Sequence, residues 1–177
     1  MNRTSRPYWF RLLCVVCLFT AQSPATTAQG QKTAAEQLAD LPRERIAIET
    51  RSARRHLFEA WRANTFAARA QGLMFIKDSE MRPDQAMIFV YEPAQRVSMW
   101  MKNTVLSLDM LFVDARGCVV TIHEMAKPGS LATIDSGVPV TLVVELRGGT
   151  VQEKGMRVGD RVRRLDFDGP REFTSCG

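Results

Sequence analysis

Residues 86–91 read Ala-Met-Ile-Phe-Val-Tyr, and residues 108–113 read Leu-Asp-Met-Leu-Phe-Val. Both runs are apolar almost throughout, and both have the length of an ordinary β-strand. A strand with one face in water alternates polar and apolar residues, whereas a strand covered on both faces is apolar at nearly every position. The two stretches therefore predict central strands of a sheet, and the rest of the fold is worked out from them.

On either side of these stretches, short runs rich in Val, Ile, Phe and Met are separated by Pro, Gly and Asp. This pattern predicts a mainly β fold: a single antiparallel β-sandwich or jelly-roll-like domain with one or two short helices, at 65–71 and 149–154. Consecutive strands are expected to pair, with hairpins at 92–95 and at 115–117, where Gly117 can adopt a positive φ. The predicted strands are residues 45–50, 56–62, 86–91, 96–102, 108–114, 118–123, 139–146 and 160–166.

The N-terminal segment is typical of a cleavable secretory signal. Arg3, Arg6 and Arg11 precede an apolar run from Leu12 to Phe19, and small and polar residues follow. A transmembrane helix needs about 20 apolar residues, so this run is too short to span a bilayer. We expect a signal peptide over residues 1–28, secretion across the inner membrane, a periplasmic location and no membrane span after cleavage.

The remaining chain is expected to form one domain, because its length is enough to close one hydrophobic core. A polar tether over 29–43 precedes a β domain over 44–168, and a C-terminal tail covers 169–177. Of the four cysteines, Cys118 and Cys176 remain after signal cleavage. In an oxidising compartment they either form a disulfide or stay as separate thiols, and their spacing does not decide between the two.

Charge and motifs exclude several classes of function. The chain has 24 Lys and Arg against 19 Asp and Glu, but three of the arginines lie in the signal segment. The basic runs at 51–55 and 161–164 have no interleaved aromatic residues, so no nucleic-acid partner is expected. The chain also lacks a nucleophile elbow, a phosphate-binding glycine loop and a dinucleotide fingerprint, and His123-Glu124 is not followed by a second histidine. No cofactor is expected, and the sequence favours a non-catalytic protein.

The densest group of chemically useful residues surrounds Trp100. If residues 97–102 form a strand, alternation directs Trp100 and Lys102 to the same face. With Asn103 and Asp109 they offer an aromatic platform, a cation, an amide and a carboxylate, which suits a small polar ligand. The same residues also fit structural roles, with the indole in the core and the Asn and Asp side chains closing loop backbone.

Glu145 stands near the end of an apolar run, residues 140–146. A buried carboxylate there must be paired, hydrogen-bonded or protonated, and Lys102 or an arginine across the sheet is a candidate partner. The leading hypothesis is a non-catalytic module that binds a small polar ligand or a partner protein; no oligomeric state is predicted. Its predicted ligand-binding residues are Trp100, Lys102, Asn103, Asp109 and Glu145.

Two alternatives come from other functional classes. A hydrolase-like enzyme would use Asp109, Glu145 and His123 as acid and base, provided that they share a cleft. A periplasmic Cu(I)-binding protein would need its soft ligands to converge, whereas methionines at alternate strand positions are more often part of a core. The candidate copper ligands are Met99, Met101, His123 and Met125.

Short motifs follow one another in a characteristic order: Arg69 with Gly72-Leu73-Met74, Met87-Ile88-Phe89-Val90, Trp100-Met101-Lys102-Asn103-Thr104, Leu108-Asp109-Met110-Leu111-Phe112-Val113-Asp114 with Gly117, Val144-Glu145-Leu146, and Gly159-Asp160. In order and spacing, over roughly 56–166, they resemble the family known as domain of unknown function 192, here as an exported member. The resemblance implies a compact, mainly antiparallel sandwich of the jelly-roll kind and implies no activity. Ser107 stands where the family usually has Pro, and Ala68 where it usually has an acid.

Overall fold

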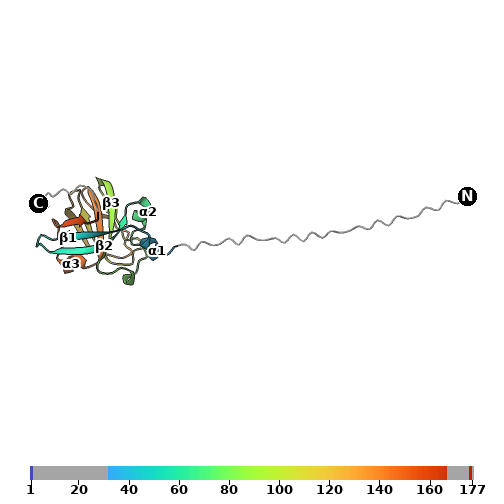
Figure 1. The fold of residues 1–177 in the computed structure, drawn as a ribbon, viewed down its shortest axis with the longest axis horizontal. Coiled ribbons are helices and arrows are strands. Elements are labelled where there is room, and N and C mark those ends of the chain that lie inside the picture. Colours follow the sequence, from blue (N-terminus) through green and yellow to red (C-terminus); the bar gives the residue numbers. More distant parts are fainter. Residues whose placement is uncertain (2–31, 167–175, 177) are drawn as a thin grey trace. The chain divides into compact units, whose positions relative to one another are not determined.

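The computed structural model describes residues 32–166 and Cys176, together with Met1. The strands are β1 (Arg43–Glu49), β2 (Arg55–Ala63), β3 (Gln85–Gln95), β4 (Ser98–Met99), β5 (Leu108–Val113), β6 (Val119–Ala126), β7 (Ile134–Asp135), β8 (Val140–Arg147) and β9 (Arg161–Arg164). The helices are α1 (Ala34–Ala39), α2 (Phe66–Gln71), α3 (Thr150–Lys154) and the 3-10 helix η1 (Asp78–Glu80). The fold is mainly β, as the sequence predicts (Figure 1).

The two stretches that decide the fold form β3 and β5, and both are central strands. The main sheet has seven strands in the order β6-β5-β8-β3-β2-β1-β9. β5 is buried at every residue and lies between β6 and β8, while β3 lies between β8 and β2. The prediction from their composition is confirmed, because each face of the sheet carries its own hydrophobic core.

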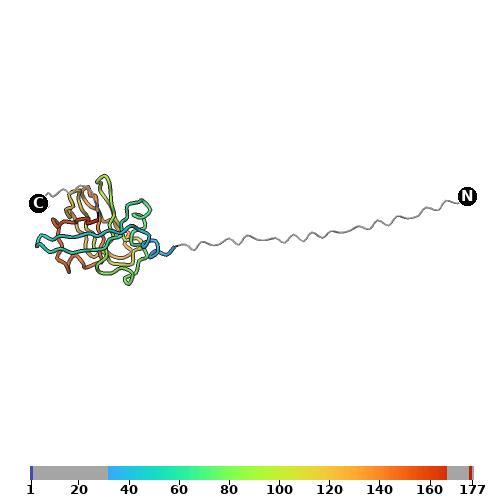
Figure 2. Tube along the Cα trace, viewed as in Figure 1, coloured from blue at the N-terminus to red at the C-terminus, as the bar shows by residue number. Residues whose placement is uncertain are grey.

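The main sheet curls around the inner of these two cores. This core takes residues from all seven strands, including Val119 at one edge of the sheet and Val162 at the other. Backbone hydrogen bonds join the two edges: the Val119 N–H donates to the Asp160 carbonyl and the Val162 N–H to the Gly117 carbonyl, both at 2.8 Å. The sheet is therefore closed on itself at one end, and Figure 2 lets the reader follow the chain from β1 (blue) to β9 (red).

The outer core covers the opposite face of the sheet. Its sheet residues alternate along the strands with those of the inner core, as Met87 and Phe89 do in β3. Leu38 of α1, together with Met101 and Ile134, packs over this face. The small β4–β7 sheet thus belongs to the layer that covers the outer core, and this layer carries the Trp100 segment.

One predicted hairpin is wrong. Residues 92–95 do not turn the chain into the next strand of the sheet, because β3 continues to Gln95 and β4 pairs with β7. Pro93 has no N–H for the ladder, and the register between β3 and β8 shifts between Val90 and Gln95. The other predicted hairpin is confirmed: β5 and β6 are antiparallel, and Gly117 between them has φ 82°.

The pairing of β2 with β3 is parallel, which departs from the predicted antiparallel order. The connection between these strands contains α2 and η1. Parallel neighbours need a long crossover, and a segment that holds two helices provides it. Both neighbours of β1 and both neighbours of β8 are antiparallel, so the predicted character holds for most of the sheet.

The ends of the predicted domain differ in what the structure describes. Apart from Met1 and Cys176, the predicted signal peptide over 1–28 and the predicted tail over 169–177 lie outside the described residues. Part of the predicted tether is folded: α1 occupies Ala34–Ala39, and Leu38 is buried in the outer core. Within the described part of the chain, no helix has the length and apolar character that a membrane crossing requires.

Cys118 and Cys176 form a disulfide, with their Cα atoms 5.4 Å apart. Cys118 directly precedes β6 and forms an isolated bridge with Arg161 of β9. The bond therefore attaches the C-terminal Cys176 to the closed end of the sheet, and it resolves the pairing that the spacing left open.

Candidate functional site

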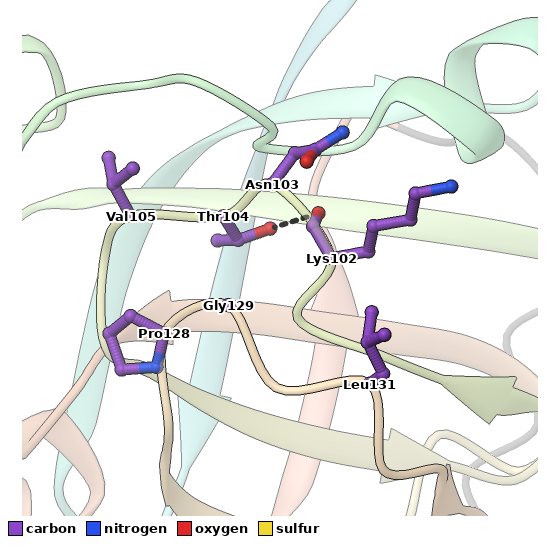
Figure 3. Close-up of a pocket in the computed structure, with 7 residues that line it drawn as sticks. All are labelled: Lys102, Asn103, Thr104, Val105, Pro128, Gly129 and Leu131. Carbon is purple, nitrogen blue, oxygen red and sulfur yellow. Dashed lines mark hydrogen bonds between the residues drawn. The ribbon is translucent and has the colours of Figure 1, made fainter.

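An open hollow of about 600 Å³ lies between two neighbouring loops, residues 102–105 and residues 128–131 (Figure 3). The Gly129 N–H donates to the Thr104 carbonyl at 3.0 Å, and the Met101 N–H donates to the Ser130 carbonyl at 3.0 Å. Backbone bonds therefore hold the two loops together. The residues that line the hollow are Lys102, Asn103, Thr104, Val105, Pro128, Gly129 and Leu131.

Trp100 and Lys102 lie on the same face, as the alternation predicts, although only Ser98 and Met99 of this segment are in a ladder. The structure shows that this face is the exposed one, which the sequence left open. The intervening Met101 is fully buried in the outer core, whereas Trp100 is 50% exposed. The Lys102 ammonium nitrogen lies 5.3 Å from the centroid of the Trp100 ring, within cation–π range. The indole is thus available at the surface, beside a cation that lines the hollow.

Asn103 owes its position to a tight turn. The Thr104 N–H donates to the Met101 carbonyl at 3.0 Å, and Asn103 has φ 56°, a conformation that Asn adopts more readily than most residues. Its carbonyl accepts a hydrogen bond from the Phe75 N–H at 2.9 Å. Phe75 also has a positive φ, of 63°, which is rare for a bulky aromatic residue and presents its ring to solvent.

Several apolar side chains that sequence reasoning missed surround this turn. Phe75, Val105 and Leu131 are all more than half exposed, and Leu131 reaches 67%. No pattern in the sequence marked them, because exposure of a single apolar residue depends on the loop that carries it. We define the Trp100 surface as Phe75, Trp100, Lys102, Asn103, Val105 and Leu131.

Asp109 does not belong to this surface. It is completely buried in β5, and its two carboxylate oxygens accept the backbone N–H groups of Met125 at 2.9 Å and Val151 at 2.8 Å. Val151 is in the first turn of α3, whose Gly149 cap offers no side chain. Asp109 therefore caps this short helix and holds it against the sheet.

The Asp109→Asn substitution is expected to lower the free energy of unfolding by about 2–3 kcal/mol, because a neutral amide replaces a buried carboxylate that accepts two backbone N–H groups. Urea denaturation at neutral pH measures the loss. Asp84→Asn is the matched control: Asp84 is exposed and pairs with Arg82 in water, so a much smaller loss is expected. Equal losses in the two variants would contradict the capping role.

Glu145 lies on the opposite face of the sheet from Asp109. The β5–β8 register pairs Asp109 with Leu146 and Met110 with Glu145, so the two acids point away from each other. On its own face, the cross-strand neighbours of Glu145 are Met110 and Met87. The carboxyl group is therefore set among thioether side chains rather than in a polar cleft.

Burial raises the pKa of Glu145 to about 8. The side chain is 4% exposed, and Oε2 has no hydrogen-bond partner within the described chain. No lysine or arginine of the described residues forms an ion pair with it, and Lys102 lies against Trp100 instead. Of the three states open to a buried carboxyl group, the protonated one fits this environment.

These positions bear on the two alternative functions. A hydrolase that uses Asp109 with Glu145 needs both in one cleft, and the sheet separates them. Among the candidate copper ligands, Met101 has no exposed surface. The sulfur of another candidate ligand, Met99, accepts a hydrogen bond from the Tyr91 hydroxyl group at 3.8 Å. The described residues hold no group of three or more His, Cys, Asp or Glu side chains that could hold a metal ion.

The comparisons with known proteins point to one family. The model of DUF192, whose description reads Uncharacterized ACR, matches residues 47–164. A crystal structure from Sinorhizobium meliloti 1021, described as a proposed transcription regulator, is 42% identical and has a TM-score of 0.69; the match covers 72% of this chain and 97% of that one. A crystal structure from Novosphingobium aromaticivorans DSM 12444, of unknown function, is 32% identical with a TM-score of 0.68, covering 76% and 99%.

No curated protein matches this chain closely enough to count as a relative. The family match nevertheless extends from β1 to β9 and includes β5, β8 and the Trp100 segment. This chain also matches the two crystal structures over nearly the whole of their length. This chain therefore belongs to the family of domain of unknown function 192.

Proposed function

We propose that this protein is a non-catalytic binding module that recognises a segment of a partner protein through the Trp100 surface. The observation that carries the proposal is the half-exposed indole of Trp100, in contact with the Lys102 ammonium group beside an open hollow. Tryptophan is enriched among the residues that dominate interface energies. The exposed aromatic and aliphatic side chains supply an anchor for apolar groups, and Lys102 supplies a charge for an acidic one.

The openness of the hollow favours a protein segment over a small molecule. Small-molecule sites enclose most of the ligand surface, whereas this hollow lies between two loops and is open to solvent. The second candidate, a small polar ligand, is favoured by Lys102 and Asn103, whose polar groups line the hollow. A partner segment that carries an apolar side chain next to an acidic residue uses both the apolar and the polar parts of the surface.

Selection from a displayed peptide library tests the proposal. Wild-type protein is expected to enrich peptides that pair an aromatic or aliphatic residue with Asp or Glu. Trp100→Ala is expected to weaken their binding by about 2 kcal/mol, or roughly thirtyfold, which is typical of a central aromatic anchor. Fluorescence polarisation with the selected peptides measures the affinity.

Phe66→Ala is the matched control, because Phe66 is an exposed aromatic residue outside the Trp100 surface. It is expected to leave peptide affinity unchanged. Peptides that bind wild type and Trp100→Ala equally well would contradict the proposal. A thermal shift with sugars, nucleotides or carboxylates that is lost in Lys102→Ala, without any peptide enrichment, would instead support the small-ligand candidate.

We further propose that the protein is exported and acts in the periplasm. The arginines and the apolar run of residues 1–28 support this location, as does the Cys118–Cys176 disulfide, since such bonds persist mainly in oxidising compartments. Alkylation of thiols in intact cells tests it: a bond formed in the cell supports export, and free thiols contradict it.

The charges of β9 (Arg161–Arg164) do not favour a nucleic-acid partner, such as a transcription regulator would need. Two of the three arginines of β9, the most basic strand, are engaged with acids of β1. Arg163 donates to Glu49 at 2.7 Å, and Arg164 donates to Glu44 at 2.6 Å. Their charges are partly neutralised within the fold, which does not favour phosphate backbone contacts.

A further inference from the structure

A second pocket, of about 400 Å³, shares no lining residue with the hollow beside Trp100. Three arginines line it, and each comes from a different element: Arg62 from β2, Arg69 from α2 and Arg164 from β9. Residues of β3 complete the wall. Three guanidinium groups in one pocket repel one another unless acidic groups neutralise part of their charge.

Glu44, which does not itself line the pocket, neutralises part of this charge. It is 5% exposed, and Arg164 donates to its two carboxylate oxygens from Nε at 2.6 Å and from Nη2 at 2.8 Å. The Nη1 atom of Arg62 lies 3.5 Å from the same carboxylate. One buried acid thus holds two arginines in position, and the Nε atom of Arg62 is buried without a hydrogen-bond partner in the described chain.

Arg69 is held without any acid. Its Nη1 donates to the Val90 carbonyl at 3.1 Å, and its guanidinium lies 5.2 Å from the centroid of the Tyr91 ring. No carboxylate among the described residues forms an ion pair with it. A guanidinium group has five N–H donors, so Arg69 is fixed in place with most of its donors uncommitted.

The pocket also carries neutral donors. The side-chain amides of Asn64 and Gln95 line it, and Glu92 is the one acid among its lining residues. Among the lining residues, the three arginines thus outnumber the single acid. Preorganised guanidinium forks match the oxygens of carboxylates and phosphates, and the cost of ordering them is already met by Glu44, Val90 and Tyr91.

We propose that this arginine pocket is a binding site for a small oxyanion, the carboxylate or phosphate group of a small molecule. Arg69 is its principal recognition residue, because no acid in the described part of the chain pairs with its charge. Arg62 and Arg164 are its fixed walls, and the Tyr91 ring holds the Arg69 guanidinium in place. This site is independent of the Trp100 surface, so either can exist without the other.

Titration with inorganic phosphate and with succinate, each against sodium chloride at equal ionic strength, tests the proposal. The readout is the NMR signal of the arginine Nε–H groups. We expect saturable shifts of the Arg69 and Arg62 signals with at least one of the two anions, at concentrations below about 10 mM, and only small linear shifts with chloride. Phosphate and succinate distinguish the two classes of ligand.

Arg69→Gln is expected to weaken the binding by at least about tenfold. Arg96→Gln is the matched control, because Arg96 is exposed and adjacent in sequence to Gln95 but does not line the pocket; it is expected to change affinity less than about twofold. Equal loss in both variants, or shifts in wild type that match those of chloride, would overturn the site. If Arg69→Gln does not fold, the wild-type titration alone decides.

Discussion

Ionisation of Glu145 is expected to lower the free energy of unfolding of the wild-type protein by about 4 kcal/mol between pH 4.5 and pH 8. Burial raises the folded-state pKa to about 8 from an ordinary value of 4.5. Between these values the unfolded chain has lost the proton and the folded chain keeps it. Folding therefore takes up a proton, and the associated stability is complete below pH 4.5 and lost as the pH rises through 8.

The Glu145→Gln variant is expected to lack this pH-dependent loss of stability, because an amide does not titrate. Urea denaturation of both proteins at intervals from pH 4.5 to pH 8.5 gives the difference, whose slope approaches about 1.4 kcal/mol per pH unit. Glu124→Gln, at an exposed position of β6, should follow the wild-type curve.

A difference between wild type and Glu145→Gln that stays constant with pH would mean that the folded protein holds this group ionised. The carbon NMR signal of the carboxyl group in wild type gives the same answer without a variant. It should titrate near pH 8. A midpoint near the ordinary value would contradict the buried, protonated state.

Loss of the Cys118–Cys176 disulfide is expected to lower the free energy of unfolding by about 2–4 kcal/mol. The two cysteines are 58 residues apart, so the bond removes a large amount of conformational freedom from the unfolded chain. Cys118 is also buried beside the hydrogen bonds that close the sheet. The double variant Cys118→Ala/Cys176→Ala should therefore unfold at a lower urea concentration.

A reductant provides the matched control. It should bring the wild type down to the stability of the double variant and leave the double variant unchanged. A wild-type protein that is insensitive to reductant while unfolded would mean that the two thiols are not joined. Equal stability of wild type and double variant under oxidising conditions would show that the bond constrains little.

The central strands could be predicted from sequence because their signal is local. Residues 86–91 and 108–113 are apolar at nearly every position, and strands covered on both faces have that composition. Period-two alternation also predicted that Trp100 and Lys102 share a face, but not that this face is exposed. The alternation persists although most of residues 97–102 lies outside a ladder, because Val97, Met99 and Met101 pack toward the core.

The roles of Asp109 and Glu145 could not be predicted, because their partners are distant in sequence. Asp109 contacts the N–H of Val151, which is 42 residues away. The neighbours that desolvate Glu145 come from β3 and β5, and only the strand order shows that they are methionines. Of the five predicted ligand-binding residues, three therefore lie at the surface and two are buried acids. Composition alone does not show which of the five are buried.

Helix α1 and the arginine pocket were missed for different reasons. Leu38 is one apolar residue in a polar segment, too little for a helical period, and its burial depends on the outer core that it covers. Arg69 stood out as part of a family motif, but its pocket needs β2, β3 and β9 to converge. The buried position of Leu38 and the arginine pocket both depend on the assembled sheet.

The pairing of β1 with β9 makes the first and last strands of the sheet neighbours, although almost the whole domain separates them along the chain. Contacts between such distant segments form late in folding, after long loops have been closed. Until residues 161–164 are available, the outer edge of β1 stays open to pairing with a strand from another molecule. A chain still emerging from the ribosome therefore cannot complete this sheet, and the exposed edge of β1 stays open to aggregation until the last segment is released.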